Sequence, residues 1–310
     1  MPTSTGWFHF SLPDFQYALL SILLEGMPFL LGGAILSGIL EEFLPQSLMT
    51  RLLPKNPRTA VVVSGFLGLI FPVCECGIVP VVRRLMRKGL PVSCGVTYML
   101  SAPIVNPLVI LSTLAAFRGQ AAIEMTALRF GLGLTVAMLA GWIVTYFSPS
   151  SILRDEILHS SGEEHTHGDP SRALLDRIQN AAEVAIRDFL DVAVYFVIGA
   201  GAASFFTTAV NQEIILPLAS SPVLSIASLM GLASVLSVCS TTDAFIAATL
   251  TTFPMAAKLA FLVFGPMLDF KLLFLYGAAF SKRFILCLAV GLFLVIGVLC
   301  WRLGTLNLGW

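Results

Sequence analysis

The chain has 310 residues, of which 57% are hydrophobic and only 12% are charged, and its mean hydropathy is +0.89. Soluble domains carry about 25% charged residues, so this chain has too little polar surface to face water and is suited to lipid. The net charge is zero, and no basic cluster is interleaved with aromatic residues. The electrostatic signature of a nucleic-acid-binding protein is therefore absent.

The first apolar stretch, residues 15–44, is longer than the core of a signal peptide and has no basic region before it. We interpret it as a retained membrane span. A disulfide framework of the secreted kind is not indicated, because five of the six cysteines lie in or beside apolar stretches. The six are Cys74, Cys76, Cys94, Cys239, Cys287 and Cys300.

Six segments are long and apolar enough to cross a bilayer, which takes about 20 residues. They are 15–43, 91–116, 127–147, 184–208, 255–277 and 284–303. We therefore expect an all-α polytopic membrane protein. Two further apolar stretches, 59–88 and 223–253, are interrupted by polar residues. Each of their arms has about 12 residues and reaches only about 18 Å, which is the middle of the bilayer.

Basic residues flank the first broken stretch on both sides, and basic flanks prefer the cytoplasm. They are Arg51, Lys55 and Arg58 before it and Arg83, Arg84, Arg87 and Lys88 after it. A re-entrant hairpin keeps both flanks inside, whereas a crossing segment puts one outside. Treating both broken stretches as hairpins gives six spans with both termini outside. The alternative is eight spans, with both broken stretches crossing.

The segment 148–182 is the one extended polar stretch, and we expect a cytoplasmic linker there. It separates a first transmembrane repeat, 1–147, from a second, 183–310. His159, His165 and His167 lie beside acidic residues in this linker and could bind a metal weakly, but a solvated linker is the simpler interpretation. We expect no resident metal and no cofactor.

The two halves resemble each other in the order and spacing of marked residues. Gly33 matches Gly199, Cys74 matches Cys239, and Asn106 matches Asp269, at nearly constant offsets. Three spans and a hairpin in each half make the second half enter the membrane from the opposite side. The sequence therefore predicts two inverted repeats, a common transporter architecture.

The two breaks are the candidate substrate site, because irregular backbone inside a membrane survives only within protein or beside a wet cavity. We expect substrate contacts from both breaks and from the polar residues that interrupt two spans. They are Cys74, Glu75, Cys76, Cys239, Ser240, Thr241, Thr242, Asp243, Asn106 and Asp269. Carboxylates at this depth are costly and are functional hypotheses by default. The structural alternative is that these residues pack and cap the hairpins.

Two thiols in the pattern Cys74-x-Cys76 suit a soft, thiophilic ligand such as a trivalent arsenical. Glu25 and Asp191, at matching positions in the first spans, are weaker candidates for gating or proton relay. Lys271 could neutralise a carboxylate near Asp269. A direct pair between these two is not expected, because helical residues two apart do not share a face.

Three classes of function are open. A secondary transporter fits the breaks best, and no P-loop for ATP is present. An intramembrane thiol redox protein would use the paired cysteines, but no H-E-x-x-H or G-x-S-x-G motif occurs, so we expect no enzyme. A membrane anchor for a partner complex has no need of carboxylates at mid-depth. The expected partners are lipid, a small molecule or ion, protons, and either a second copy or a membrane partner protein.

The segments Phe71-Pro72-Val73-Cys74-Glu75-Cys76-Gly77 and Ser101-Ala102-Pro103-Ile104-Val105-Asn106-Pro107 resemble the predicted-permease family that includes the organoarsenical efflux permeases (ArsP-like permeases). Residues 239–245 and 265–269 are similar to it as well. The resemblance implies a multi-pass permease of the bacterial inner membrane, with relatives that export trivalent arsenicals. Family members are usually drawn with eight spans. Many carry a small residue where this chain has Glu75, which adds negative charge between the cysteines.

Overall fold

The computed structural model describes residues 11–44, 54, 56–71, 73–153, 174–209 and 221–305. Within these ranges the regular structure is α-helical, with one isolated β-bridge between Leu153 and Phe280. Five described helical segments are long and apolar enough to span a membrane. They are Leu12–Phe43, Ala122–Val144, Leu174–Thr208, Met255–Tyr276 and Lys282–Thr305. The expected all-α, polytopic membrane fold is confirmed.

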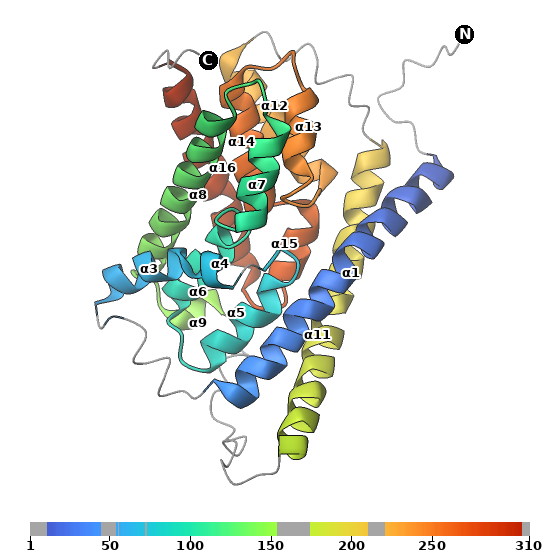
Figure 1. Ribbon diagram of the computed structural model, residues 1–310, viewed down its shortest axis with the longest axis vertical. Helices are drawn as coiled ribbons and strands as arrows, with labels where there is room; N and C mark the ends of the chain where they lie inside the picture. The colour runs from blue at the N-terminus through green and yellow to red at the C-terminus, as the bar shows by residue number, and fades with distance from the viewer. Residues whose placement is uncertain are drawn as a thin grey trace.

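The helices follow the expected order along the chain (Figure 1). In the first half they are α1 (Leu12–Phe43), α3 (Pro57–Gly65), α4 (Leu67–Ile70), α5 (Ile78–Arg87), α6 (Val92–Ser101), α7 (Pro107–Ala116) and α8 (Ala122–Val144). The short α9 (Pro149–Ile152) follows. In the second half they are α11 (Leu174–Ala209), α12 (Pro222–Leu236), α13 (Asp243–Thr249), α14 (Met255–Met267), α15 (Phe270–Tyr276) and α16 (Lys282–Thr305).

The segment expected as one span at 91–116 is two helices, α6 and α7, of ten residues each. Proline explains the break, because it donates no backbone hydrogen bond and disfavours a helical residue before it. Asn106 ends the break by capping α7, since its side chain accepts a hydrogen bond from the Leu108 N–H at 3.0 Å. Asp269 does the same for α15, accepting from the Leu272 N–H at 2.7 Å. These matched residues satisfy backbone groups at two broken helices.

The first broken stretch returns to the end at which it started. Its arm α5 begins beside the middle of α1 and ends where α1 ends, because Lys88 Nζ donates to the carbonyls of Glu41 and Leu44. Its other arm starts near the end of α8, where Trp142 Nε1 donates to the Arg58 carbonyl at 3.3 Å. We call this end of the bundle, where α1, α5 and α8 finish, the basic end. The contacts agree with a hairpin rather than a crossing.

The second broken stretch lies at the opposite end. The helix α16 starts at the basic end, where the Ser281 N–H donates to the Ile152 carbonyl at 2.8 Å. At its far end, Trp301 lines one groove with Val223 of α12, and Gly304 lies next to Ala256 of α14. The stretch that joins these residues, α12 and α13, therefore enters and leaves at the far end (Figure 1). The six-span count and the inverted symmetry of the halves stay predictions.

The matched first helices of the halves, α1 and α11, pack against each other and stand beside the remaining helices (Figure 1). Glycine lets both come close to the breaks. A Cβ on Gly33 would collide with the backbone of Gly77 in the first break, and a Cβ on Gly199 would lie 2.8 Å from the Lys271 carbonyl oxygen. Close backbone approach of this kind is what a helix interface in a membrane favours.

Some expectations lie outside the described residues. They concern His159, His165 and His167 with most of the linker, and the basic residues Arg51 and Lys55. The division into 1–147, 148–182 and 183–310 also stays a prediction.

Candidate functional site

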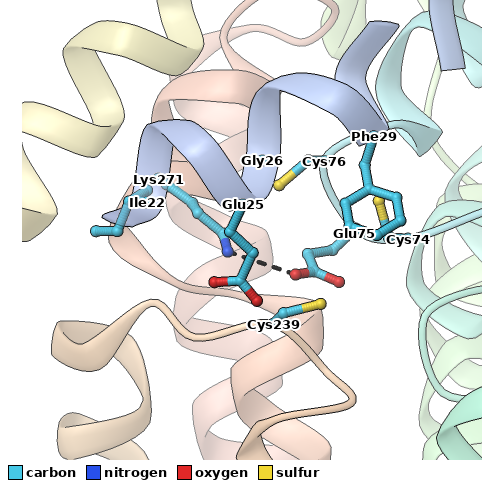
Figure 2. A pocket seen from close by; sticks show the side chains of 9 residues that line it. All are labelled: Ile22, Glu25, Gly26, Phe29, Cys74, Glu75, Cys76, Cys239 and Lys271. Atoms are coloured by element: carbon cyan, nitrogen blue, oxygen red, sulfur yellow. Dashed lines mark hydrogen bonds and ion pairs between the residues drawn. The ribbon is translucent and has the colours of Figure 1, made fainter. Parts of the chain in front are cut away.

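A small pocket lies where the two breaks meet α1. Its volume is about 10 Å³, which is close to the room that one water molecule needs. Nine residues from four parts of the chain line it (Figure 2). They are Ile22, Glu25, Gly26 and Phe29 of α1, Cys74, Glu75 and Cys76 of the first break, Cys239 of the second break, and Lys271 of α15.

The tips of the two hairpins touch each other through side chains. Ser240 Oγ donates to Glu75 Oε2 at 3.2 Å, and both residues are almost fully buried, at 2% and 1% exposed. The two residues are 165 positions apart in the chain. The structure thus brings the two sequence-predicted breaks into one place, and it does so with a polar contact that the apolar surroundings protect from water.

Glu75 is neutralised by Lys271 from the other half of the chain. Lys271 Nζ lies 3.4 Å from Glu75 Oε1 and 3.6 Å from Asp269 Oδ2. The Ser237 carbonyl accepts a third contact from the same ammonium group at 3.0 Å. All three charged side chains are at most 5% exposed. We call Glu75, Lys271 and Asp269 the buried triad.

The expectation that Lys271 and Asp269 do not pair was wrong. The rule that residues two apart point to different faces holds inside a helix, but Asp269 is not inside one. It precedes α15 in an extended conformation and caps it. From that position its side chain folds over the first turn, so both its capping contact and its ion pair reach residues that follow it closely.

The second break is held by a residue that the sequence interpretation did not single out. Arg129 of α8 is 2% exposed and donates to both carboxylate oxygens of Asp243, at 2.9 and 3.0 Å. It also donates to the Ser240 carbonyl at 2.9 Å and to Thr113 Oγ1 at 2.8 Å. The signal was available, because an arginine within the apolar span 127–147 needs a partner at that depth.

The remaining predicted site residues have different positions. Cys76 and Cys239 are buried beside Glu75, and Cys74 is half-buried. Thr241 is partly buried, and Thr242 is exposed and stands before α13 without making a side-chain cap. Asn106 and Asp243 are not among the pocket-lining residues, and Asp269 reaches the pocket through Lys271.

Of the two matched carboxylates in the first helices, one lies at the pocket and one does not. Glu25 lines the pocket on α1. Asp191 of α11 instead pairs with Arg83 of α5 at 3.3 Å. Three further residues of α1 that line the pocket, Ile22, Gly26 and Phe29, carried no signal in the sequence, because apolar residues on a membrane helix are ordinary.

The cysteines and carboxylates of this site do not form a metal cage. Among the described residues, no group of three or more histidine, cysteine, aspartate or glutamate side chains is arranged to hold a metal ion. All six cysteines are free thiols. The site therefore offers separate sulfur atoms, one paired carboxylate and an apolar wall.

Comparison with known proteins identifies the family. Residues 11–302 match the family described as predicted permease. The chain belongs to this predicted-permease family. A relative in Bacillus subtilis (strain 168), named UPF0718 protein YcgR, is 41% identical over 280 residues, which cover 89% of this chain and 92% of the relative. A protein of Streptococcus mutans is 34% identical over 289 residues, covering 93% and 94%. It is described as a candidate subunit of a two-component membrane permease complex.

No solved structure matches the chain at a significant level. The predicted-permease match covers both halves, the two breaks and the buried triad. Together with the five membrane-spanning helical segments, this membership makes the chain a multi-pass membrane permease.

Proposed function

We propose that this permease is a secondary transporter that exports a small, thiophilic solute through a site at the two hairpin tips. The observation that carries the proposal is the contact of Ser240 with Glu75 at 3.2 Å, which joins the tips of two hairpins that enter from opposite ends. Broken helices that meet near the middle of a membrane are the usual place of a transport site.

The chemistry around this contact supports the class of cargo. Cys74, Cys76 and Cys239 surround Glu75 in the pocket (Figure 2). Thiolates prefer soft ligands, and Phe29 and Ile22 add an apolar wall that suits an organic substituent. A trivalent methyl- or phenylarsenical combines both properties. No ATP-binding motif is present, so an ion gradient or a partner must drive uphill export.

The test is survival of bacterial cells that lack arsenical exporters, grown with methyl- or phenylarsenite. We expect cells that express the chain to survive higher concentrations, and Cys74→Ser, Cys76→Ser and Glu75→Gln to remove the protection. Cys287→Ser is the matched control, because that thiol is exposed and is not among the pocket-lining residues. Normal sensitivity with the protein present in the membrane would overturn the arsenical cargo.

A second candidate function follows from the Streptococcus mutans relative, which is described as a subunit of a two-component complex. In that case the chain transports only together with a membrane partner. Purification from its native membrane in mild detergent would yield a stoichiometric partner. Transport by the purified chain alone, reconstituted in vesicles, would contradict this candidate.

A further inference from the structure

The buried triad holds more negative than positive charge. Glu75 and Asp269 are 1% exposed each, and Lys271 is 4% exposed. One ammonium group therefore faces two carboxyl groups in almost fully buried surroundings. A buried carboxylate without a full counter-charge is strongly disfavoured, and two carboxyl groups that share one site keep a proton between them.

One carboxylate oxygen of the triad has no hydrogen-bond donor. Glu75 is well satisfied, with Lys271 Nζ at one oxygen and Ser240 Oγ at the other. Asp269 Oδ1 accepts from the Leu272 N–H. Asp269 Oδ2 is buried and has no hydrogen-bond partner, and Lys271 Nζ lies 3.6 Å from it. This oxygen is the place where an added proton removes an uncompensated charge.

Other charged or titratable groups near the triad do not supply the missing charge. The neighbouring groups are Glu25 of α1, Cys74 and Cys76 of the first break, Cys239 of the second break, Tyr276 of α15, and the pair of Arg129 (α8) with Asp243 (α13). Arg129 is already bound to Asp243. Tyr276 Oη donates to the Met267 carbonyl at 2.8 Å. On α5, Arg83 and Arg84 pair with Asp191 and Asp188 of α11.

We infer that Glu75, Lys271 and Asp269 form a binding site for one exchangeable proton, the coupling ion of this permease. A proton fits better than a metal cation for two reasons. The pocket has a volume of about 10 Å³, and no described group of ligands is arranged for a metal ion. The proton adds to a carboxylate oxygen and takes the triad from a net charge of −1 to zero. Its release restores −1.

The protonation state of Asp269 affects the contact between the two hairpins, and it does so through Lys271. When Asp269 is protonated, the ammonium group of Lys271 forms its ion pair with Glu75 alone and holds that carboxylate in place. With Asp269 ionised, the same ammonium group is divided between two carboxylates at nearly equal distances, 3.4 and 3.6 Å. Glu75 is then held less firmly, and Glu75 is the residue that Ser240 of the second hairpin contacts. The proton and the contact between the hairpins are thereby linked.

Infrared spectroscopy of the purified full chain in lipid vesicles tests this site, because a protonated carboxyl group has a C=O band that a carboxylate lacks. At neutral pH we expect Asp269→Asn and Glu75→Gln each to lower this band by about one carboxyl equivalent per chain, since interacting groups titrate as a unit. The double variant lowers it by the same single equivalent, because only one proton is shared. Lys271→Gln raises it, since both carboxyl groups then need a proton.

Asp14→Asn is the matched control, because Asp14 is exposed at the start of α1, and it leaves the band unchanged. An unchanged band in both single variants would overturn the proton site. A loss of two equivalents in the double variant would overturn the sharing. In Asp269→Asn, the asparagine keeps the side-chain oxygen that caps α15. Glu75→Gln tests for the same shared proton and leaves that cap unaltered. The inference rests on the proposed transport function. The infrared band is measured without any transported solute, so failure of arsenical export and failure of the proton site are separate outcomes.

Discussion

Arg129 and Asp243 form a buried pair in which one guanidinium nitrogen contacts both carboxylate oxygens, at 2.9 and 3.0 Å, across 114 residues of chain. Glu75 and Lys271 form the corresponding pair at the other break, across 196 residues. In each case the carboxylate belongs to a hairpin of one half and the cation to a helix of the other half. Each hairpin tip is therefore positioned by the opposite half of the molecule.

Removing one partner of the Arg129–Asp243 pair leaves a buried charge without compensation. We expect Arg129→Met to lower the free energy of unfolding by about 3–5 kcal/mol, measured by thermal unfolding in detergent. Replacing Asp243 by leucine in the same chain should recover much of that loss, because no charge then stays buried. Arg118→Met is the control, since Arg118 is exposed. Equal unfolding temperatures for Arg129→Met and Arg118→Met would contradict the pair's role.

Gly33 and Gly32 are adjacent on α1 but face different surroundings. A Cβ at Gly33 would collide with the Gly77 backbone, whereas one at Gly32 meets nothing within 4 Å. We expect Gly33→Ala to cost about 1–3 kcal/mol of stability, the usual range for overpacking. Gly32→Ala should be neutral or stabilise the helix by up to about 1 kcal/mol. Thermal unfolding of the two variants side by side checks this, and similar losses in both would refute the close approach.

Two aspartates of α11 pair with adjacent arginines of α5 but differ in burial. The Asp188 side chain is 5% exposed and lies 2.9 Å from Arg84, whereas the Asp191 side chain is 57% exposed and lies 3.3 Å from Arg83. We expect Asp188→Asn to cost about 3 kcal/mol, because it leaves Arg84 buried with only the weaker Glu41 contact. Asp191→Asn should cost less than Asp188→Asn, because water screens the exposed carboxylate of Asp191 even though Arg83 is as buried as Arg84. Chemical or thermal unfolding that ranks the variants the other way would be inconsistent with the structure.

The hairpin arrangement predicts that both flanks of the first broken stretch are on one side of the membrane. Arg58→Cys and Lys88→Cys should react with an impermeant maleimide in inverted vesicles and not in intact cells, since basic loops stay in the cytoplasm. Thr251→Cys, in the exposed turn after α13, should show the reverse. Labelling of Arg58→Cys and Lys88→Cys from opposite sides would establish a crossing segment and eight spans instead.

The breaks themselves could be predicted from the sequence, because proline and polar residues within apolar stretches have local consequences. Asn106 and Asp269 show this well, since each caps the helix that directly follows it. The partners could not be predicted in the same way. Arg129 stands out as a charge in an apolar span, but its distance of 114 residues from Asp243 leaves no pattern in the sequence.

The pairing of Lys271 with Asp269 illustrates a different reason for failure. The sequence suggested an interruption of the span near Asp269, but the pair was judged by a rule that holds only within a continuous helix, where two side chains two residues apart diverge. The break just before α15 changed the geometry of only one or two residues. Contacts near helix ends depend on where the helix begins to within one residue, and sequence patterns locate that point less accurately.

The asymmetry of the ion pairs has a mechanical consequence. At the basic end, α5 is fastened to α1 and α11 through Arg83, Arg84 and Lys88. Among the residues that the structure describes, the hydrogen bond between α11 and the second hairpin at the far end is that of Thr207 to the Val235 carbonyl at 2.8 Å. A pocket of about 10 Å³ must widen before it admits an organic solute. The ion pairs that hold α1 and α11 to α5 all lie at the basic end, so widening of the pocket at the far end of these two helices breaks none of them.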